Sequence, residues 1–177
     1  LDEAYKDYVS SEPVNTTCSL LSRFPNLLIT RTFSKIYGLA GLRLGYAMGT
    51  QAVIQTLQTV RPPFNVNTIA LNAAYRIVTA YPDFATQSRE SNHNGYRQYT
   101  DAAPSWPVTW LDSSANFCCF LMPSHTGKAL FDHCIKHGII IRTLDSFGLP
   151  NGVRITIGTE AMNTRVIKAI NLFFKTS

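Results

Sequence analysis

Lys35 is the residue of this 177-residue sequence whose position most favours covalent chemistry. It follows an apolar, β-branched run and lies on a turn of small residues, within the segment TFSK at 32–35. A lysine at the end of a buried strand sits where strand ends present ligands, and partial burial makes its amine a better nucleophile. A solvated loop lysine is the alternative, because most lysines are exposed. Ser34 and Arg43 favour the first interpretation, since a hydroxyl and a guanidinium so close by suit a phosphate.

Asp2 and Tyr5 add two further groups at another apparent strand end. A carboxylate that faces a pyridine nitrogen keeps it protonated and makes the ring an electron sink, and a phenol can hydrogen-bond the ring's phenolic oxygen. Together with Lys35 these are the parts that a pyridoxal-phosphate (PLP) site needs. The residue types therefore suit a PLP site around Lys35.

Short strands and helices must position these residues. Apolar and β-branched runs predict two strands on either side of the small-residue turn at 34–41, and helical spacing predicts two helices after them, the second capped by Asn67. The predicted strands span 27–33 and 44–48, and the predicted helices 52–60 and 67–78. Tyr81 and Pro82 are the expected boundary between a domain at 1–80 and a domain at 81–177.

The second domain is expected to mix strands with helices more evenly. Strands are predicted at 108–111, 116–122, 139–143 and 153–157, and helices at 83–101, 126–137 and 160–174. In the last helix, Met162, Val166, Ile170 and Phe173 fall near one face. This order favours an α/β first domain and an α+β second domain.

Composition excludes several classes of protein. The formal charge of +5 comes from scattered Lys and Arg, so we expect no nucleic-acid partner. No apolar stretch is long enough to cross a bilayer and no signal peptide is present, which favours a cytoplasmic protein with no membrane contact. The four cysteines show no CxxC pair, in keeping with a reducing compartment. His133 and His137 are four apart on a predicted helix but have no third ligand, so we expect no metal site.

Two segments resemble the cofactor core of fold-type I PLP-dependent aminotransferases: DEAY at 2–5 and TFSKIYGLAGLRLGY at 32–46. The resemblance is closest to the histidinol-phosphate aminotransferase group, and RPPFNVN at 61–67 and VRITIGT at 153–159 extend it. It implies the α/β PLP-dependent transferase fold, with a mainly parallel sheet in a partial large domain and an α+β small C-terminal domain. Aromatic residues outside these roles, such as Tyr37, Tyr46 and Phe64, are expected to pack in the interior.

The resemblance also implies a role for each matching residue. Lys35 would form the internal aldimine and move the proton between substrate and cofactor. Asp2 would pair with the pyridine nitrogen, Tyr5 with the ring oxygen, and Ser34 and Arg43 with the cofactor phosphate. Two arginines would bind the substrate's acidic groups, Arg154 and, as in the histidinol-phosphate group, Arg142. The alternative for Arg142 is a surface ion pair with an acid such as Asp145.

The function implied is transfer of an amino group from L-histidinol phosphate to 2-oxoglutarate, in histidine biosynthesis. Two alternatives keep the cofactor: an aromatic amino-acid aminotransferase and a threonine-phosphate decarboxylase. A third is a non-catalytic module derived from such an enzyme. Since the matching residues belong to the C-terminal half of the family's chain, we expect a missing N-terminal half, a homodimer as in relatives, and exposed sheet edges and apolar surface. Alone, the chain is expected to self-associate with little or no activity.

Overall fold

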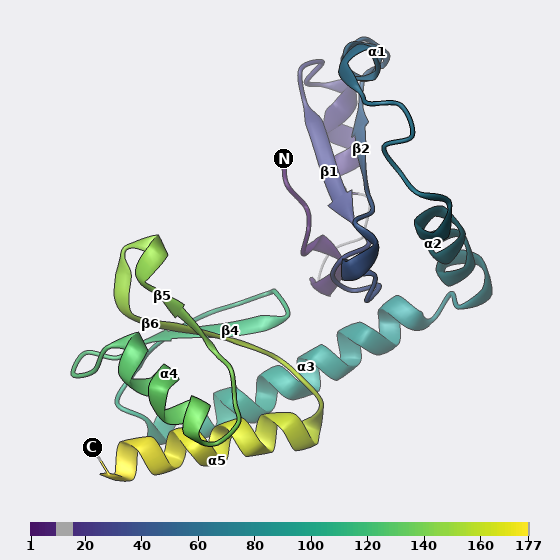
Figure 1. The fold of residues 1–177 in the computed structure, drawn as a ribbon. Coiled ribbons are helices and arrows are strands. Elements are labelled where there is room, and N and C mark those ends of the chain that lie inside the picture. The colour runs from purple at the N-terminus through teal and green to yellow at the C-terminus, as the bar shows by residue number, and fades with distance from the viewer. Residues whose placement is uncertain (10–15, 177) are drawn as a thin grey trace. The chain divides into compact units, whose positions relative to one another are not determined.

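The chain forms two compact units, Leu1–Arg89 and Glu90–Ser177. The computed structural model describes residues 1–9 and 16–176 (Figure 1). The division between the units falls within α3 (Phe84–Ala102), a long helix that contributes residues to both. The turn at Tyr81 and Pro82 directly precedes this helix. The domain limits 1–80 and 81–177 remain a prediction about the parent enzyme.

The first unit is built around two paired strands. Its elements are β1 (Leu28–Thr32), β2 (Gly45–Gly49), α1 (Gln51–Val60), α2 (Thr68–Ala80) and the short 3-10 helices η1 (Lys6–Tyr8), η2 (Thr16–Ser22) and η3 (Ala40–Leu42). β1 and β2 are antiparallel, and the segment at 1–3 joins the other edge of β1 through a parallel bridge between Asp2 and Thr30. The β1–β2 pair is antiparallel because a turn with η3 joins the two strands, with no crossover helix of the kind that parallel neighbours need.

Helix α2 begins and packs as its sequence predicts. The side chain of Asn67 accepts a hydrogen bond from the backbone N–H of Ala70 at 2.8 Å, which caps the helix. Two small residues one turn apart, Ala70 and Ala74, are buried against Leu44 and the apolar residues around it. Because small side chains allow close approach, α2 supports the loop that leads into β2.

Other apolar side chains of the first unit remain uncovered. Phe64 is 98% exposed, so its expected place in the interior is wrong. Ile69 and Tyr75 on α2 are 73% and 70% exposed. The described part of the first unit therefore presents apolar surface, as expected of a partial domain.

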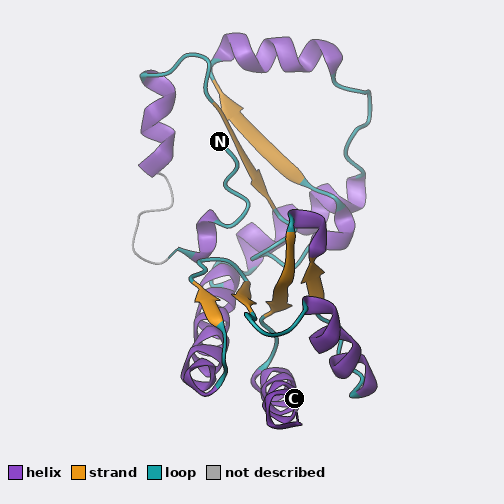
Figure 2. Ribbon diagram, turned by 90° about the vertical axis from the view of Figure 1, so that its left-hand side faces the viewer, coloured by secondary structure: helices purple, strands orange, loops and turns teal. Residues whose placement is uncertain are grey.

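The second unit is a four-stranded antiparallel sheet with helices on one face, in the order β3-β4-β6-β5. Figure 2 shows the strands beside the helices. Beyond the second part of α3, its elements are η4 (Ala103–Ser105), β3 (Thr109–Leu111), β4 (Phe117–Leu121), α4 (Gly127–Lys136), β5 (Arg142–Leu144), η5 (Asp145–Phe147), β6 (Leu149–Thr156) and α5 (Glu160–Thr176). The α+β prediction for this part of the chain is confirmed.

One face of this sheet forms the core with α3, α4 and α5. Tyr99, Phe120, Leu130, Val153 and Ile170 are among its fully buried side chains. Along β4, Cys118 is buried in this core while its neighbour Cys119 is only partly buried. The alternation of side chains along a strand thus separates the two thiols.

Asn163 replaces Met162 as the buried residue at the start of α5. Met162 is 59% exposed, which contradicts its predicted place on the inner face, whereas Asn163 is 1% exposed. The Asn163 side chain accepts from the backbone N–H of Gly158 at 2.8 Å and donates to the side chain of Gln98 at 2.9 Å. These hydrogen bonds connect the start of α5 to α3 and satisfy the buried amide of Asn163. An apolar residue at this position could not form them. No helix in the described residues is long and apolar enough to cross a membrane.

Candidate functional site

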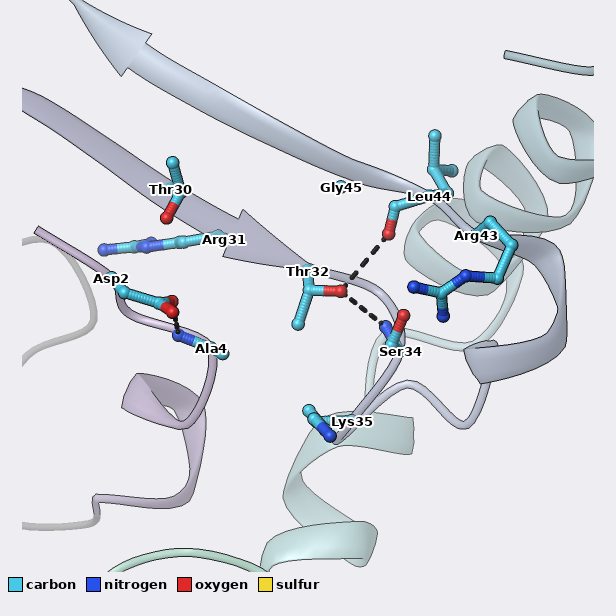
Figure 3. Close-up of a pocket in the computed structure, with 10 residues that line it drawn as sticks. All are labelled: Asp2, Ala4, Thr30, Arg31, Thr32, Ser34, Lys35, Arg43, Leu44 and Gly45. Carbon is cyan, nitrogen blue, oxygen red and sulfur yellow. Dashed lines mark hydrogen bonds between the residues drawn. The ribbon is translucent and has the colours of Figure 1, made fainter. Parts of the chain in front are cut away.

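A pocket of about 380 Å³ lies in the first unit, between the segment at 1–4, the end of β1 and the start of β2. It is lined by Asp2, Ala4, Thr30, Arg31, Thr32, Ser34, Lys35, Arg43, Leu44 and Gly45. Figure 3 shows Asp2 on one side of the pocket, Ser34 and Arg43 on the other, and Lys35 between them. A single cavity thus brings together the predicted Asp2, Ser34, Lys35 and Arg43, with Thr30, Arg31 and Thr32 as polar neighbours that were not predicted.

The turn after β1 fixes Ser34 and Lys35 at the rim of this pocket. The hydroxyl of Thr32 accepts from the backbone N–H of Ser34 at 3.0 Å and donates to the carbonyl of Leu44 at 3.3 Å. The backbone N–H of Gly38 then donates to the carbonyl of Lys35 at 2.9 Å, with Gly38 in the left-handed region at φ 68°. This closed turn holds the lysine at the end of the strand. Sequence reasoning overlooked Thr32, although a Thr two residues before a turn N–H is typical of a side-chain-stabilised turn.

Asp2 and Tyr5 lie on the segment that runs along the other edge of β1. Asp2 pairs with Thr30, and its carboxylate accepts a hydrogen bond from the backbone N–H of Ala4 at 3.0 Å. The ring centroid of Tyr5 lies 5.2 Å from the Lys35 amine, within the range of a cation–π contact. Tyr5 is therefore beside Lys35, although it does not line the pocket itself.

Arg43 has a strained backbone at the pocket wall. It adopts the left-handed conformation at φ 55°, which costs a residue with a side chain about 1–3 kcal/mol. One of its guanidinium nitrogens donates to the carbonyl of Ala40 at 2.8 Å. This bond and the strain direct the side chain toward Ser34, as Figure 3 shows. Such strain is typical of functional sites, where the surrounding structure enforces it.

A buried ion pair between Glu3 and Arg31 lies beside the pocket. The Nε and Nη2 atoms of Arg31 both lie 2.8 Å from Oε2 of Glu3, and the two side chains are only 5% and 4% exposed. Burial on its own would lower the pKa of Arg31, but the hydrogen bonds to Glu3 and Tyr46 outweigh it and raise the pKa. Sequence reasoning missed this pair. The available indication was an arginine inside an otherwise β-branched strand, where an unpaired charge is too costly to bury.

Arg142 and Arg154 form a separate feature in the second unit. They are direct partners in the β5–β6 ladder, so both side chains are on the same face of the sheet. The guanidinium of Arg142 lies 5.4 Å from the ring of Phe147, and that of Arg154 lies 4.9 Å from the ring of Phe117. Like charges that face each other across strands are unfavourable, so the arrangement is typical of a site that binds an anion.

Cys119 lies next to the arginine pair on the same face, opposite Arg154 in the β4–β6 ladder. Burial raises the pKa of the Cys119 thiol, and the positive charge of Arg154 partly opposes that effect. The thiol is therefore held mainly in its neutral form, as a small packing group beside the arginines.

His133 and His137 serve packing in the second unit. Their ring centroids are 4.8 Å apart, and Nε2 of His133 lies 3.0 Å from the carbonyl oxygen of Ala169 on α5. The His133 ring also meets Phe173 edge-on at 5.4 Å. Within residues 1–9 and 16–176, no group of three His, Cys, Asp or Glu side chains is arranged to hold a metal ion.

The residues of the pocket fit PLP by their chemistry. PLP needs an amine for its aldehyde, an anion for its pyridine nitrogen, and donors for its phosphate. Lys35, Asp2 and the Ser34–Arg43 pair offer these groups within one cavity. A volume of about 380 Å³ also lies within the range of roughly 300–1,000 Å³ that is usual for small-molecule sites.

Comparison with known proteins agrees with this arrangement. Residues 1–170 match the sequence family described as "Aminotransferase class I and II". The histidinol-phosphate aminotransferase 1 of Nitrosococcus oceani is 41% identical over 170 residues, which cover 96% of this chain but 45% of that protein. The chain thus spans less than half the length of this curated relative.

Solved structures share the fold. The histidinol-phosphate aminotransferase of Sinorhizobium meliloti, in complex with pyridoxal-5'-phosphate, superposes with a TM-score of 0.88 at 27% identity and covers 99% of this chain and 48% of its own. The L-threonine-O-3-phosphate decarboxylase of Porphyromonas gingivalis has a TM-score of 0.84 at 24% identity and covers 99% of this chain and 54% of its own. At that identity the second likeness concerns the fold alone. The predicted fold type is confirmed.

Proposed function

Since the chain belongs to the class I and II aminotransferases, we propose that it is the part of a histidinol-phosphate aminotransferase that holds pyridoxal 5'-phosphate on Lys35. The observation that carries this proposal is the single pocket shared by Lys35, Asp2, Ser34 and Arg43. The similarity to histidinol-phosphate aminotransferases supports the choice within the family.

Each pocket residue has one task in this proposal. The Lys35 amine would hold PLP through its aldehyde and, once the substrate's amine takes its place there, would accept the proton from the substrate carbon and return it, a general-base role that suits an amine at a strand end. The Asp2 carboxylate would keep the pyridine nitrogen in its charged form, and the Tyr5 phenol, which lies beside the amine, would donate to the ring oxygen. Ser34 and Arg43 would bind the phosphate. When bound, PLP supplies an electron sink that stabilises negative charge at the substrate carbon.

The opposed arginines support a phosphorylated substrate. Arg154 would grip the carboxylate of an amino or oxo acid, and Arg142 the phosphate of L-histidinol phosphate, with 2-oxoglutarate as the amino acceptor. Each charge-assisted hydrogen bond contributes about 1.5–3 kcal/mol. Among residues 1–9 and 16–176, Asp145 forms no ion pair with Arg142, whose contact there is the Phe147 ring. This weakens the alternative of a surface pair.

Two alternatives within the family remain distinguishable. A threonine-phosphate decarboxylase would use the same arginine pair, whereas an aromatic amino-acid aminotransferase has no need of the phosphate partner. We propose also that the parent enzyme is a homodimer in a reducing compartment such as the cytoplasm. The free thiols of Cys18, Cys118, Cys119 and Cys134 support the latter.

Covalent labelling tests the cofactor assignment. The purified chain is mixed with PLP, reduced with borohydride and digested, and the peptides are analysed by mass spectrometry. We expect a pyridoxyl adduct on Lys35, and none at that peptide in Lys35→Ala. Labelling spread evenly over surface lysines would contradict the proposal and favour a non-catalytic module.

Ligand-induced stabilisation tests the substrate assignment. We expect L-histidinol phosphate to raise the melting temperature of the PLP-loaded chain, and L-histidinol and L-phenylalanine to raise it less. Arg142→Ala should abolish this difference. An Arg142→Ala protein that still distinguishes the phosphorylated amine would exclude the proposed role of Arg142.

In solution the chain should self-associate, and a monomer that transaminates L-histidinol phosphate would contradict our expectation for the chain alone.

A further inference from the structure

Glu3 and Arg31 form an ion pair in which both side chains are buried. The proposed chemistry does not use this pair. We propose that this pair is a register lock, which sets the strand segment at 1–3 against β1 and so places Asp2 across the pocket from Lys35. The inference rests on the proposed function, because it assigns Asp2 to the cofactor. In this scheme the charged groups of Glu3 and Arg31 act by positioning Asp2, although Arg31 also lines the pocket.

The backbone alone does not specify this pairing. The backbone N–H of Thr30 donates to the carbonyl of Leu1 at 3.0 Å, and the backbone N–H of Glu3 donates to the carbonyl of Thr30 at 2.9 Å. Bonds of this kind form at any register and with any side chains. A slip by one residue moves a strand by about 3.3 Å and turns every side chain to the other face. Asp2 would then face away from the pocket.

Burial of the charges supplies the missing specificity. Glu3 meets Arg31 only when the segment has its observed register. In a slipped register Glu3 would turn to the other face and leave Arg31 buried without its partner, and an unpaired buried charge is strongly destabilising. A buried pair of this kind adds little net stability compared with apolar residues, but it penalises the wrong pairings. The pair therefore contributes more to the correct register of the segment at 1–3 than to the stability of the fold.

Arg31 also connects the Glu3 segment to β2. It lies directly opposite Tyr46 in the β1–β2 ladder, and its guanidinium donates a hydrogen bond to that side chain. Next to Tyr46 in β2 is Gly45, which lines the pocket and has no room for a side chain, because a Cβ there would lie 2.7 Å from the carbonyl oxygen of Arg31. One guanidinium thus links the Asp2 segment, the strand that leads to Lys35, and the strand at the pocket wall.

A double-mutant cycle with Asp2 tests this role. The affinity of the full chain for PLP is measured by absorbance titration for wild type, Arg31→Met, Asp2→Ala and the double variant. If Arg31 acts through Asp2, Arg31→Met weakens PLP binding by about tenfold in the wild-type background and by less than about twofold in the Asp2→Ala background. Equal factors in both backgrounds, or no loss in the first, would overturn the proposal, since a role in general stability does not depend on Asp2.

A second variant covers the case in which Arg31→Met does not fold. Glu3→Gln with Arg31→Met removes both charges and leaves no unpaired one, so the fold is retained while the register loses its lock. The same dependence on Asp2 is expected. Lys128→Met is the matched control, because it breaks an exposed ion pair with Asp132 of 2.7 Å in the second unit, and it should change the affinity less than about twofold.

Hydrogen exchange separates this inference from the proposed function. In the variant that lacks both charges, the backbone amides of Glu3 and Thr30 should lose protection whether or not PLP binds. Unchanged protection of these amides overturns the lock. If wild type forms no borohydride-fixed adduct on Lys35, the proposed function fails, and the exchange result still decides whether the pair sets the register.

Discussion

Arg142→Gln should weaken anion binding by the second unit while leaving the unit's basal stability almost unchanged. Arg142 and Arg154 face each other across β5 and β6. At a separation of about 6 Å, two charges repel by roughly 0.7 kcal/mol in water and by about twice that at half the dielectric constant. The substitution relieves this repulsion but also removes the contact with Phe147, which contributes about 0.5–1 kcal/mol at an exposed site. The two effects nearly cancel, and we expect a net change within about 0.5 kcal/mol.

The response to phosphate should differ much more. At about ten times the dissociation constant, an anion that binds the folded state stabilises it by roughly 1.4 kcal/mol. Loss of one charge-assisted contact, of about 1.5–3 kcal/mol, weakens binding at least tenfold. The same phosphate concentration then stabilises the variant by about 0.4 kcal/mol or less. For a domain of this size these values correspond to rises in melting temperature of roughly 6–11 °C for wild type and 2–3 °C for the variant.

Differential scanning fluorimetry in phosphate and in chloride of equal ionic strength measures this response. Arg165→Gln is the control, because it removes the same charge from an exposed position on α5. It should keep the wild-type response. The reasoning fails if Arg142→Gln keeps the full rise, or if Arg165→Gln loses it equally, since charge alone would then explain the effect.

Three further predictions concern packing and pH. Gly95→Ala should destabilise the second unit by about 1–2 kcal/mol in a urea titration, because its Cβ would lie 2.7 Å from the Asn163 amide nitrogen and overpacking outweighs the gain of about 1 kcal/mol in helix propensity; a more stable variant would show that α5 yields easily. Asn67→Ala should cost about 1 kcal/mol through loss of the α2 cap, with Asn67→Asp largely retaining it, and equal stabilities would argue against the cap. Burial raises the thiol pKa of Cys118 to about 12 and of Cys134 to about 11. The raised pKa values stabilise the folded state in full below pH 9.0, the ordinary thiol pKa, and this stabilisation is lost as the pH rises from 9.0 toward the raised values. With alanine at both positions, the melting temperature should fall less steeply over the same pH range.

Local patterns identified four residues of the first unit that the structure places around one pocket. Lys35, Ser34, Arg43 and Asp2 were identified from residue types near strand ends, and the structure brings them into one pocket. Their roles toward the cofactor remain predictions. Short-range rules sufficed here because the turn at 34–41 is closed by its own residues and by the strands on either side.

Contacts between residues far apart in the chain could not be predicted from local sequence patterns. Glu3 and Arg31 are 28 residues apart, and neither has a neighbour that indicates the other. The direction of β2 is likewise not specified by local residues, since an apolar run looks alike in parallel and antiparallel neighbours. Phe64 was assigned to the interior on residue type alone, but exposure depends on which other segments cover it.

The two proposed groups of binding residues belong to different compact units. Every residue that lines the pocket precedes Arg89, and both opposed arginines follow Glu90. If the proposed roles hold, the residues that select the substrate's anion can be exchanged without replacing any residue that lines the cavity around Lys35.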